Sequence, residues 1–393
     1  MLSDATGAPR ALRPTEPFDV AVIGAGIVGC ASAWRLAEAG LKVALIERES
    51  APAMGSTGRS AAGIRLQFSD ATNIALSAAS LAEYRQLPQS GYRPIGYLLL
   101  VPEAQWPDHL AAVALQRRHG APVQVLSPEE SNRIVPADTT GLAGATWCAT
   151  DGVLDPHGIC LHYAARARER GAQAMYRAQV TAIRCESALW TIEAGDQTIR
   201  ARQVINAAGA WAGEIAALAG LRVPVDAARR IVFASAELPP SISRAQPYPL
   251  TVDLGTGFYF RSEGQRLIFG QSNPEDRGFS EGIDWNWLDT VIESALDRFP
   301  WFDQVSLDRR ASWWGYYEDT PDHNAIIGRD PAQPGWINAC GFSGHGVQQA
   351  AAVGRLVAQI ATGEPPFIDI GALALARFDG NAGTRGASER LIV

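Results

Sequence analysis

A short apolar segment that runs directly into a glycine-rich turn constrains the fold more than any other feature. Residues 18–23 (FDVAVI) read as a buried β-strand, and Gly24, Gly26 and Gly29 follow with GxGxxG spacing. In a nucleotide-binding βαβ unit the first glycine permits a tight turn, the second admits a pyrophosphate, and the third lets the helix lie close to the sheet. The helix that begins near Ile27 then offers unpaired N–H groups to the phosphates.

An acidic residue lies where such a unit needs one. The helix is expected to reach about Ala39, with Gly40 ending it, and residues 42–46 (KVALI) read as the second strand. Glu47 closes that strand, where a carboxylate can accept both hydroxyls of a ribose, and Arg48 follows it. A lone glycine pattern is weak evidence, but strand, helix, second strand and acid in register predict a dinucleotide site. The alternative is a glycine-rich turn with Glu47 as a solvated strand end.

The bulk composition excludes several classes of protein. With 393 residues the chain can form two domains or one large divided domain. A net charge of −7 and the lack of a basic block argue against nucleic-acid binding. We expect no membrane span, since no stretch approaches about 20 apolar residues. Residues 1–16 lack the apolar run of a signal peptide and are expected to be flexible. The five cysteines are scattered without a CxxC pair, which predicts reduced thiols, a cytoplasmic location and no metal site.

Three further segments are expected to approach a ligand. Residues 55–65 (GSTGRSAAGIR) are mostly small or polar, which suits a segment whose backbone lies against a ligand. Residues 204–211 (VINAAGAW) read as a buried strand that ends in small residues and a glycine before a helix. Residues 341–348 (GFSGHGVQ) run into a helix that is expected over residues 347–361. They would thus place another helix N-terminus toward an anionic group. The alternative is a structural tight turn, with His345 hydrogen-bonded locally.

Other elements follow from apolar periodicity. Helices are predicted over 71–84, 108–119, 156–170 and 284–299. Strands are predicted over 96–101, 178–183, 190–192 and 336–340. Residues 223–269 alternate in polarity with frequent Pro and Gly, which predicts an antiparallel sheet. Residues from 378 to 393 read as a loose tail.

Glycine-rich turns spread from residue 24 to residue 346 are too many for a simple NAD dehydrogenase. In order and spacing they resemble the D-amino-acid oxidase superfamily of FAD enzymes, which includes glycine oxidase, sarcosine oxidase and dimethylglycine dehydrogenase. The matching segments are 20–48, 55–65, 204–211, 320–328 and 341–348. Residues 66–69 and 96–100 also resemble bacterial relatives of a mitochondrial FAD-domain protein implicated in assembling respiratory complex I.

The resemblance implies an α/β fold with a Rossmann-like FAD-binding domain built from discontinuous segments. It also implies an α+β substrate domain whose large antiparallel sheet covers the flavin. We assign residues 17–88, 142–222 and 320–377 to the FAD domain and residues 89–141 and 223–319 to the substrate domain. The implied reaction is hydride transfer to flavin N5 from the carbon next to the nitrogen of a secondary or tertiary amine or amino acid, giving an imine that water hydrolyses.

Departures from the family pattern refine these expectations. Relatives with covalent flavin use a cysteine where this chain has Gly315, or a histidine in the segment that here spans 55–65, so FAD is expected to be non-covalent. Arg65 falls where sarcosine oxidase places its carboxylate-binding arginine, and the lysine that assists it is replaced by Gln348. Lys42 is the only lysine in the chain. It lies on a strand of the nucleotide-binding unit and is expected to be too remote to act on the flavin. Residues 266–270 (RLIFG) match the stretch in which sarcosine oxidase places a lysine over the flavin, and they carry apolar residues there. An electron acceptor other than O₂ is therefore expected, with Arg266 as the alternative cation.

The predicted site residues form two groups. Those expected to face the substrate are Arg65, Tyr259, Tyr317 and Gln348. Those expected to hold the cofactor are Gly24, Gly26, Ile27, Gly29, Glu47, Arg48, Ser56, Thr57, Arg59, Ser60, Ala61, Val180, Ala208, Gly209, Trp211, Gly315, Gly344, His345, Gly346, Val347 and Gln348. The alternative for Arg59 is a surface position, for Arg65 a structural ion pair, and for Tyr259 ordinary core.

Two other function classes stay open. One is a flavoprotein that assembles or carries electrons within a larger complex and has little substrate chemistry of its own. The other is a subunit of a multi-chain amine dehydrogenase, in which hetero-oligomeric partner subunits receive the electrons. Anaerobic mixing with a panel of amines separates them from a free-standing enzyme, because an enzyme's bound flavin bleaches.

Overall fold

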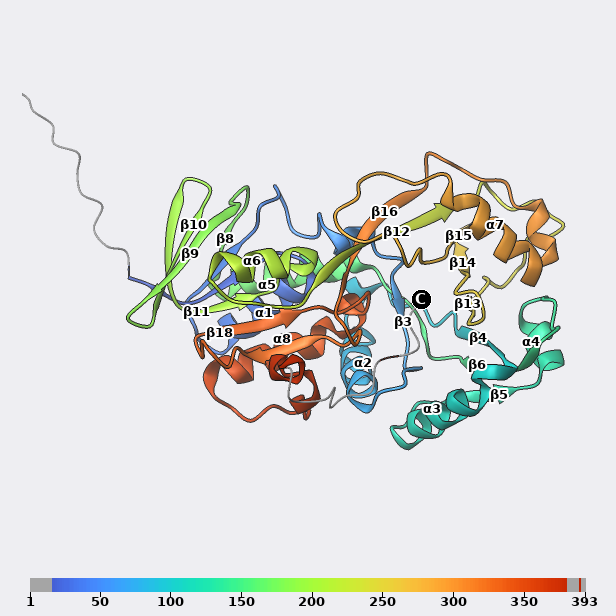
Figure 1. Ribbon diagram of the computed structural model, residues 1–393, viewed down its shortest axis with the longest axis horizontal. Helices are drawn as coiled ribbons and strands as arrows, with labels where there is room; N and C mark the ends of the chain where they lie inside the picture. The colour runs from blue at the N-terminus through green and yellow to red at the C-terminus, as the bar shows by residue number, and fades with distance from the viewer. Residues whose placement is uncertain (1–15, 380–388, 390–393) are drawn as a thin grey trace, which may run out of the picture.

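The structure is a computed structural model that describes residues 16–379 and residue 389. Two large sheets divide the described chain into two halves, which lie at opposite ends of Figure 1. The first half carries the N-terminal nucleotide-binding unit, and the second carries a mostly antiparallel sheet. The expected α/β fold with a second, α+β half is therefore confirmed.

The first sheet has a parallel centre. Its strands run in the order β17-β18-β11-β1-β2-β8, and the β9–β10 hairpin joins it through β11. The bounds are β1 Phe18–Ile23, β2 Val43–Ile46, β8 Gln173–Met175, β9 Val180–Glu186, β10 Leu189–Ala194, β11 Gln197–Asn206, β17 Ile326–Arg329 and β18 Trp336–Cys340. Strand β1 pairs in parallel with both β2 and β11. The ends of these three strands therefore meet at one edge, where ligands bind in open α/β sheets.

Both faces of this sheet are covered, because its central strands are apolar on both sides. Val20 and Val22 join one core, and Ala21 and Ile23 join the other, as alternation along a strand requires. The helices on the first face are α1 Ile27–Glu38, α2 Ala71–Tyr84, α5 Pro156–Glu169 and α8 Gly346–Thr362. Helix α6 (Ala212–Leu218) and the β9–β10 hairpin contribute to the second.

The second sheet carries the other half of the molecule. Its order is β16-β12-β15-β14-β13-β4-β6-β5. The bounds are β4 Tyr97–Pro102, β5 Gln124–Leu126, β6 Leu142–Cys148, β12 Asp226–Ala234, β13 Leu250–Asp253, β14 Tyr259–Glu263, β15 Arg266–Gly270 and β16 Trp313–Asp319. Helices α3 (Trp106–Arg118), α4 (Pro128–Ile134) and α7 (Trp287–Arg298) lie in the same half.

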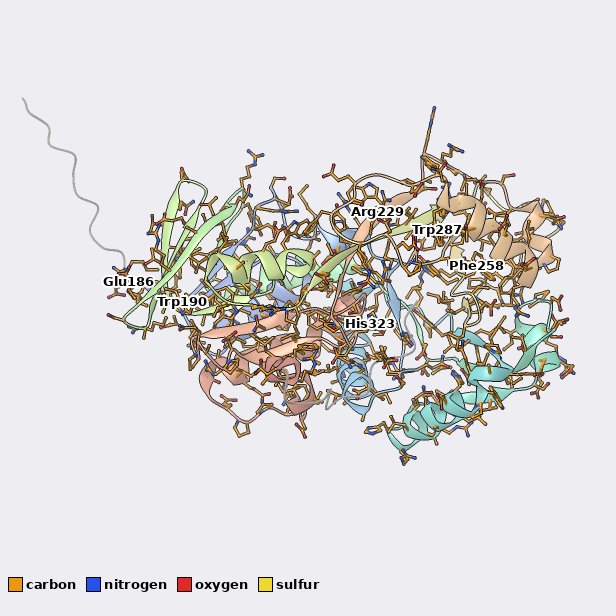
Figure 2. All side chains as sticks on the ribbon, in the orientation of Figure 1. Glu186, Trp190, Arg229, Phe258, Trp287 and His323 are labelled. Atoms are coloured by element: carbon orange, nitrogen blue, oxygen red, sulfur yellow. The ribbon has the colours of Figure 1, made fainter. Side chains whose placement is uncertain are left out.

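Aromatic side chains mark the two separate cores in Figure 2. Trp190, at the β9–β10 end, packs on Trp336 with 5.4 Å between the ring centroids. In the other half Phe258 is fully buried and packs edge-on against Phe302, at 5.5 Å between centroids. The two sheets are therefore stabilised by different cores and can position residues on either side of a shared cavity.

Most predicted elements are confirmed within a few residues, and the differences concern the second half. The sheet is not wholly antiparallel, since β13 pairs in parallel with β4. The predicted domain boundary at residue 142 is wrong, because β6 pairs with β4 and β5 in the substrate-domain sheet. The prediction of a loose tail is wrong at Glu389, whose buried carboxylate accepts the backbone N–H of Ser69 at 3.1 Å. The rest of 380–393 and residues 1–15 lie outside the described residues.

No helix in the described part of the chain is long and apolar enough to cross a membrane. The same residues contain no group of three or more His, Cys, Asp or Glu side chains that could hold a metal ion. The five cysteines are free thiols.

Candidate active site

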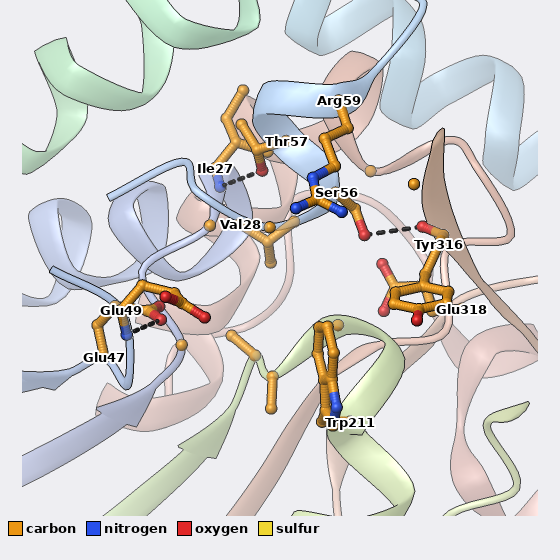
Figure 3. Close-up of a pocket in the computed structure, with 18 of the residues that line it drawn as sticks. Ile27, Val28, Glu47, Glu49, Ser56, Thr57, Arg59, Trp211, Tyr316 and Glu318 are labelled. Carbon is orange, nitrogen blue, oxygen red and sulfur yellow. Dashed lines mark hydrogen bonds between the residues drawn. The ribbon is translucent and has the colours of Figure 1, made fainter. Parts of the chain in front are cut away.

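A cavity of about 590 Å³ lies between the two halves (Figure 3). Its lining combines the C-terminal ends of β1, β2 and β11 with the N-terminus of α8, and strands β12, β14 and β16 complete it from the other half. The 3₁₀ helix η1 (Ser56–Arg59) forms a further wall. The volume is in the range of cofactor and ligand pockets.

The nucleotide-binding end is built around Glu47. One oxygen of its carboxylate accepts the backbone N–H of Ala25 at 2.6 Å, and the other accepts the N–H of Glu49 at 2.9 Å (Figure 3). These bonds hold the carboxylate at the cavity edge while each oxygen keeps capacity for another donor. A Cβ at Gly29 would overlap with the carbonyl oxygen of Gly24, which explains the close approach of α1 to the turn.

The N-terminus of α1 is open to an anion. Gly26 caps it without a side chain, and its first turn holds no acidic residue. Thr57 of η1 accepts the N–H of Ile27 at 3.0 Å and ties this turn to the 3₁₀ helix. Unpaired N–H groups with a partial positive charge remain for a phosphate.

The N-terminus of α8 is the second open helix end at the cavity. It has no side-chain cap and no acid in its first turn, and Gly344, Gly346 and Val347 line the cavity. Strand β16 holds this turn in place, because the carboxyl of Glu318 accepts the N–H of Gly341 at 2.9 Å. The backbone carbonyl of Glu318 accepts the N–H of Ser343 at 3.1 Å. Burial raises the pKa of Glu318 to about 7.

Polar side chains line the cavity from the second sheet, among them Arg230 on β12, Tyr259 on β14 and Tyr317 on β16. The guanidinium carbon of Arg230 lies 4.9 Å from the centroid of the Tyr317 ring, and its Nη2 lies 3.1 Å from Oδ2 of Asp319. The Nε of Arg230 is buried and has no hydrogen-bond partner among the described residues. Burial raises the pKa of both tyrosines, so both phenols are neutral.

The structure brings 20 of the 24 predicted site residues to the lining of this cavity. Gly29 lies behind the first turn. The other three, Arg65, His345 and Gln348, form a buried cluster outside the lining. In that cluster the guanidinium of Arg65 donates to the carbonyl of Gln67, and its Nη2 lies 3.3 Å from Nε2 of His345.

Gln348 belongs to the same cluster, because its Oε1 accepts the backbone N–H of Arg65 at 2.9 Å. Burial and the neighbouring Arg65 charge lower the pKa of His345 well below its usual value. The cluster therefore connects the segment around Arg65 to the first turn of α8, behind the cavity wall. The substrate-binding roles of Arg65 and Gln348 stay predictions.

Sequence reasoning missed several lining residues, most notably Arg230, Tyr316 and Glu318. Arg230 lies directly opposite Gly315 in the β12–β16 register, and that pairing carries no local sequence signal. Tyr316 contributes through its backbone, since its carbonyl accepts the hydroxyl of Ser56 at 2.7 Å (Figure 3). Glu318 lies two residues before the matching segment 320–328, and this nearness was the one signal available.

The lining fits FAD. Two open helix N-termini and a held carboxylate suit a pyrophosphate and a ribose, and the cavity extends from these groups to the tyrosines of the second sheet. No cysteine or histidine lines the cavity among the described residues. Non-covalent attachment of the FAD stays a prediction.

Known proteins share this architecture over most of the chain. The family model for FAD-dependent oxidoreductases (DAO) matches residues 19–360. FAD-dependent oxidoreductase domain-containing protein 1 of Bos taurus is 29% identical, with 93% of this chain and 85% of the relative covered. Mitochondrial sarcosine dehydrogenase of Homo sapiens is 28% identical, and the match covers 95% of this chain but only 42% of the longer human protein.

Solved structures show the same similarity over most of the chain. L-proline dehydrogenase from P. horikoshii superimposes with a TM-score of 0.84 at 28% identity, over 93% of this chain and 99% of that one. Glycine oxidase from Geobacillus kaustophilus has a TM-score of 0.79 over 92% of this chain and 99% of its own, and at 24% identity it supports the fold alone. The chain therefore belongs to the DAO family of FAD-dependent oxidoreductases.

Proposed function

We propose that the protein is an FAD-dependent dehydrogenase that oxidises the C–N bond of a secondary or tertiary amine carrying a carboxylate. The observation that supports this most directly is the convergence of Arg230, Tyr259 and Tyr317 on the cavity that the α8 N-terminus also enters. A cation beside neutral aromatic side chains suits a small amino acid, because the charge can hold its carboxylate while the rings surround its substituents.

The comparisons favour the same substrate class. The printed names of two relatives, sarcosine dehydrogenase and L-proline dehydrogenase, each specify an amino acid whose nitrogen is a secondary amine. We carry this class over to the present chain as a proposal and do not choose between the two amino acids.

The residues would act by binding and orientation. Arg230 would hold the substrate carboxylate, and Tyr259 and Tyr317 would form the apolar wall that disfavours a charged ammonium, so the amine nitrogen keeps its lone pair. Bound FAD supplies the redox chemistry as hydride acceptor. Arg65, which the family pattern favours as the carboxylate ligand, is the competing candidate.

We also propose that electrons leave to an acceptor other than O₂, either a small molecule or a hetero-oligomeric partner subunit. Lys42 donates to the carbonyl of Glu16 at 3.1 Å and does not line the cavity, so it is not placed to promote reaction with O₂. The five free thiols support the proposal that the protein works in a reducing compartment such as the cytoplasm.

Anaerobic mixing of the holoprotein with secondary and tertiary amino acids tests the proposal. Bleaching of the flavin by a carboxylated secondary amine, with weak or no bleaching by the matching uncharged amide, is the expected result. An absence of bleaching by every amine, together with stable co-purification of other subunits, would favour an assembly or electron-transfer role instead.

A further inference from the structure

A second cavity, of about 710 Å³, opens beside the first. Strand β16 passes from one to the other: Trp313 and Trp314 line the second cavity, and Gly315 begins the lining of the first. Trp285 and Arg59 also line the second cavity, and Arg59 is common to both. A molecule bound in the second cavity would therefore lie next to the cofactor cavity, with Arg59 in the wall between them.

The walls of this cavity are flat, apolar and partly exposed. The indoles of Trp285, Trp313 and Trp314 are each only half-buried. Trp285 and Trp314 pack on one core, and Trp313, the neighbour of Trp314 on β16, packs on another, yet all three line this hollow. Exposed aromatic side chains gathered in this way often mark a binding site. The indole N–H of Trp313 donates to the carbonyl of Arg59 at 2.8 Å, which fixes that ring relative to the shared wall.

Two arginines add positive charge to the aromatic surface. The guanidinium carbon of Arg59 lies 4.6 Å from the centroid of Trp314, and that of Arg309 lies 4.5 Å from the centroid of Trp285. Within the described chain, the Arg59 side chain makes no hydrogen bond or ion pair besides this stacking. Its N–H groups can therefore donate to an oxygen acceptor placed against the indoles.

We propose that this second cavity binds the electron acceptor, and that the acceptor is a planar quinone. Its ring would stack on the indoles, and Arg59 would donate to a carbonyl oxygen whose negative charge grows as the ring is reduced.

The electron balance rests on the proposed function, which supplies the reductant. Oxidation of a secondary amine breaks one C–H and one N–H bond and releases two electrons and two protons: R₂CH–NHR′ → R₂C=NR′ + 2 e⁻ + 2 H⁺. A tertiary amine has no N–H bond, so it gives an iminium ion with two electrons and one proton, and hydrolysis of that ion releases the second proton. The quinone takes up the same number: Q + 2 e⁻ + 2 H⁺ → QH₂. The cofactor returns to its oxidised state, and water then hydrolyses the imine to the carbonyl product and an amine.

Two variants with opposite steric effects test the site, together with a matched control. Trp285→Leu removes a stacking surface, whereas Ile283→Trp adds bulk to a residue of the same cavity wall. Trp106→Leu makes the same chemical change as Trp285→Leu at a residue that lines neither cavity. The FAD content and melting temperature of each holoprotein show whether the variant is folded and loaded.

The holoprotein is first reduced anaerobically with one equivalent of dithionite, so that the test does not depend on finding the substrate. It is then mixed anaerobically with a short-chain dimethoxy-methyl-benzoquinone, and reoxidation is followed at the flavin absorbance. We expect the second-order rate constant to fall tenfold or more in both cavity variants and to stay unchanged in Trp106→Leu. Saturable binding of this quinone to the oxidised holoprotein, measured by calorimetry, should weaken by a similar factor.

Several outcomes would overturn the proposal. They are wild-type reoxidation rates in both cavity variants, non-saturable quinone binding, or loss of FAD from Trp285→Leu, which would assign that residue to the cofactor site. Reoxidation by a partner protein but not by the quinone would also overturn it. Failure of every amine to bleach the flavin would count against the proposed function alone, since this experiment bypasses that step.

Discussion

Gly344 lies so close to the ring of Tyr317 that a Cβ at this position would overlap with the ring. The contact joins the turn before α8, which belongs to the FAD-binding half, to strand β16 of the second sheet. Gly344 also has a φ of +89°, a conformation that favours glycine. The two halves of the cavity are therefore held together where the cofactor and the substrate are expected to meet.

Gly344→Ala should disrupt this junction. We expect the free energy of unfolding to fall by about 2 kcal/mol or more, because steric overlap adds to the cost of a positive φ. Gly363→Ala is the control, since Gly363 has a φ of +80° at the other end of α8 and nothing within 4 Å of a new Cβ. The control should lose only about 1 kcal/mol. Urea denaturation of both variants measures the difference, and equal losses would show that the Tyr317 contact is unimportant.

Arg230→Gln should lower kcat/KM for a carboxylated amine by about 10- to 100-fold, which corresponds to a lost charge-assisted bond of about 1.5–3 kcal/mol. FAD content should not change, and the uncharged amide of the same amine should be turned over equally by both proteins. Arg65→Ala is the competing variant, for which the family pattern predicts the same 10- to 100-fold loss. If kcat/KM falls only in Arg65→Ala, Arg65 and not Arg230 binds the substrate carboxylate.

Glu318 should make stability depend on pH. The pKa of its carboxyl is about 7 in the folded protein, whereas the ordinary value is 4.5. At a pH between these two values the native state therefore holds a proton that the unfolded chain has released. The free energy of unfolding should therefore fall as pH rises from about 4.5 to 7, by about 3 kcal/mol, and then level off.

Glu318→Gln should remove this part of the slope, because the amide stays neutral throughout. Asp151, whose pKa burial raises to about 7, contributes a slope of the same sign and is untouched by the substitution. Denaturant titrations of the wild-type protein and of Glu318→Gln at pH 5 and pH 8 isolate the contribution of Glu318 to the pH dependence of the free energy of unfolding. Identical pH slopes would show that Glu318 ionises normally in the folded protein.

Glu47→Ala should weaken FAD binding by about 1–3 kcal/mol, because the carboxylate can no longer accept the ribose hydroxyls. Glu49→Ala is the matched control, since Glu49 also lines the cavity but bonds to Glu47 through its backbone N–H. Calorimetric titration of the apoprotein with FAD measures the affinity of both variants.

Heat or acid should release all of the flavin from the protein. Flavin that stays with the denatured chain would contradict a non-covalent cofactor.

The reduced protein should react slowly with O₂. Superoxide formation is helped by an uncompensated cation, and the cation of the substrate end, Arg230, lies 3.1 Å from Asp319. Arg266 is likewise paired, with Asp308 at 3.4 Å, and lines neither cavity. Peroxide production under air should therefore be much slower than turnover with an artificial acceptor. Comparable rates would refute this expectation.

The sequence by itself determined the parts of the protein that are local in the chain. The βαβ unit around Gly24 and Glu47 could be predicted because strand, turn, helix and acid lie within about 30 residues and each leaves a periodic or turn signal. Helix α2 and the glycine-rich turn before α8 were predictable for the same reason. Their convergence on one cavity was predictable only through the resemblance to a family.

Tertiary structure alone decided whether Arg230 or Arg65 lines that cavity. Arg230 follows Arg229 on a strand and Arg65 lies between Ile64 and Leu66, and neither short segment shows which way the side chain points. The β12–β16 register places Arg230 opposite Gly315 and toward the cavity, whereas bonds to Gln67 and His345 hold Arg65 behind its wall. The placement of β6 in the second sheet is likewise decided by long-range strand pairing, with β4 and β5. Strand pairing and side-chain burial join residues far apart in sequence, and their energetics depend on partners that no short segment of the chain contains.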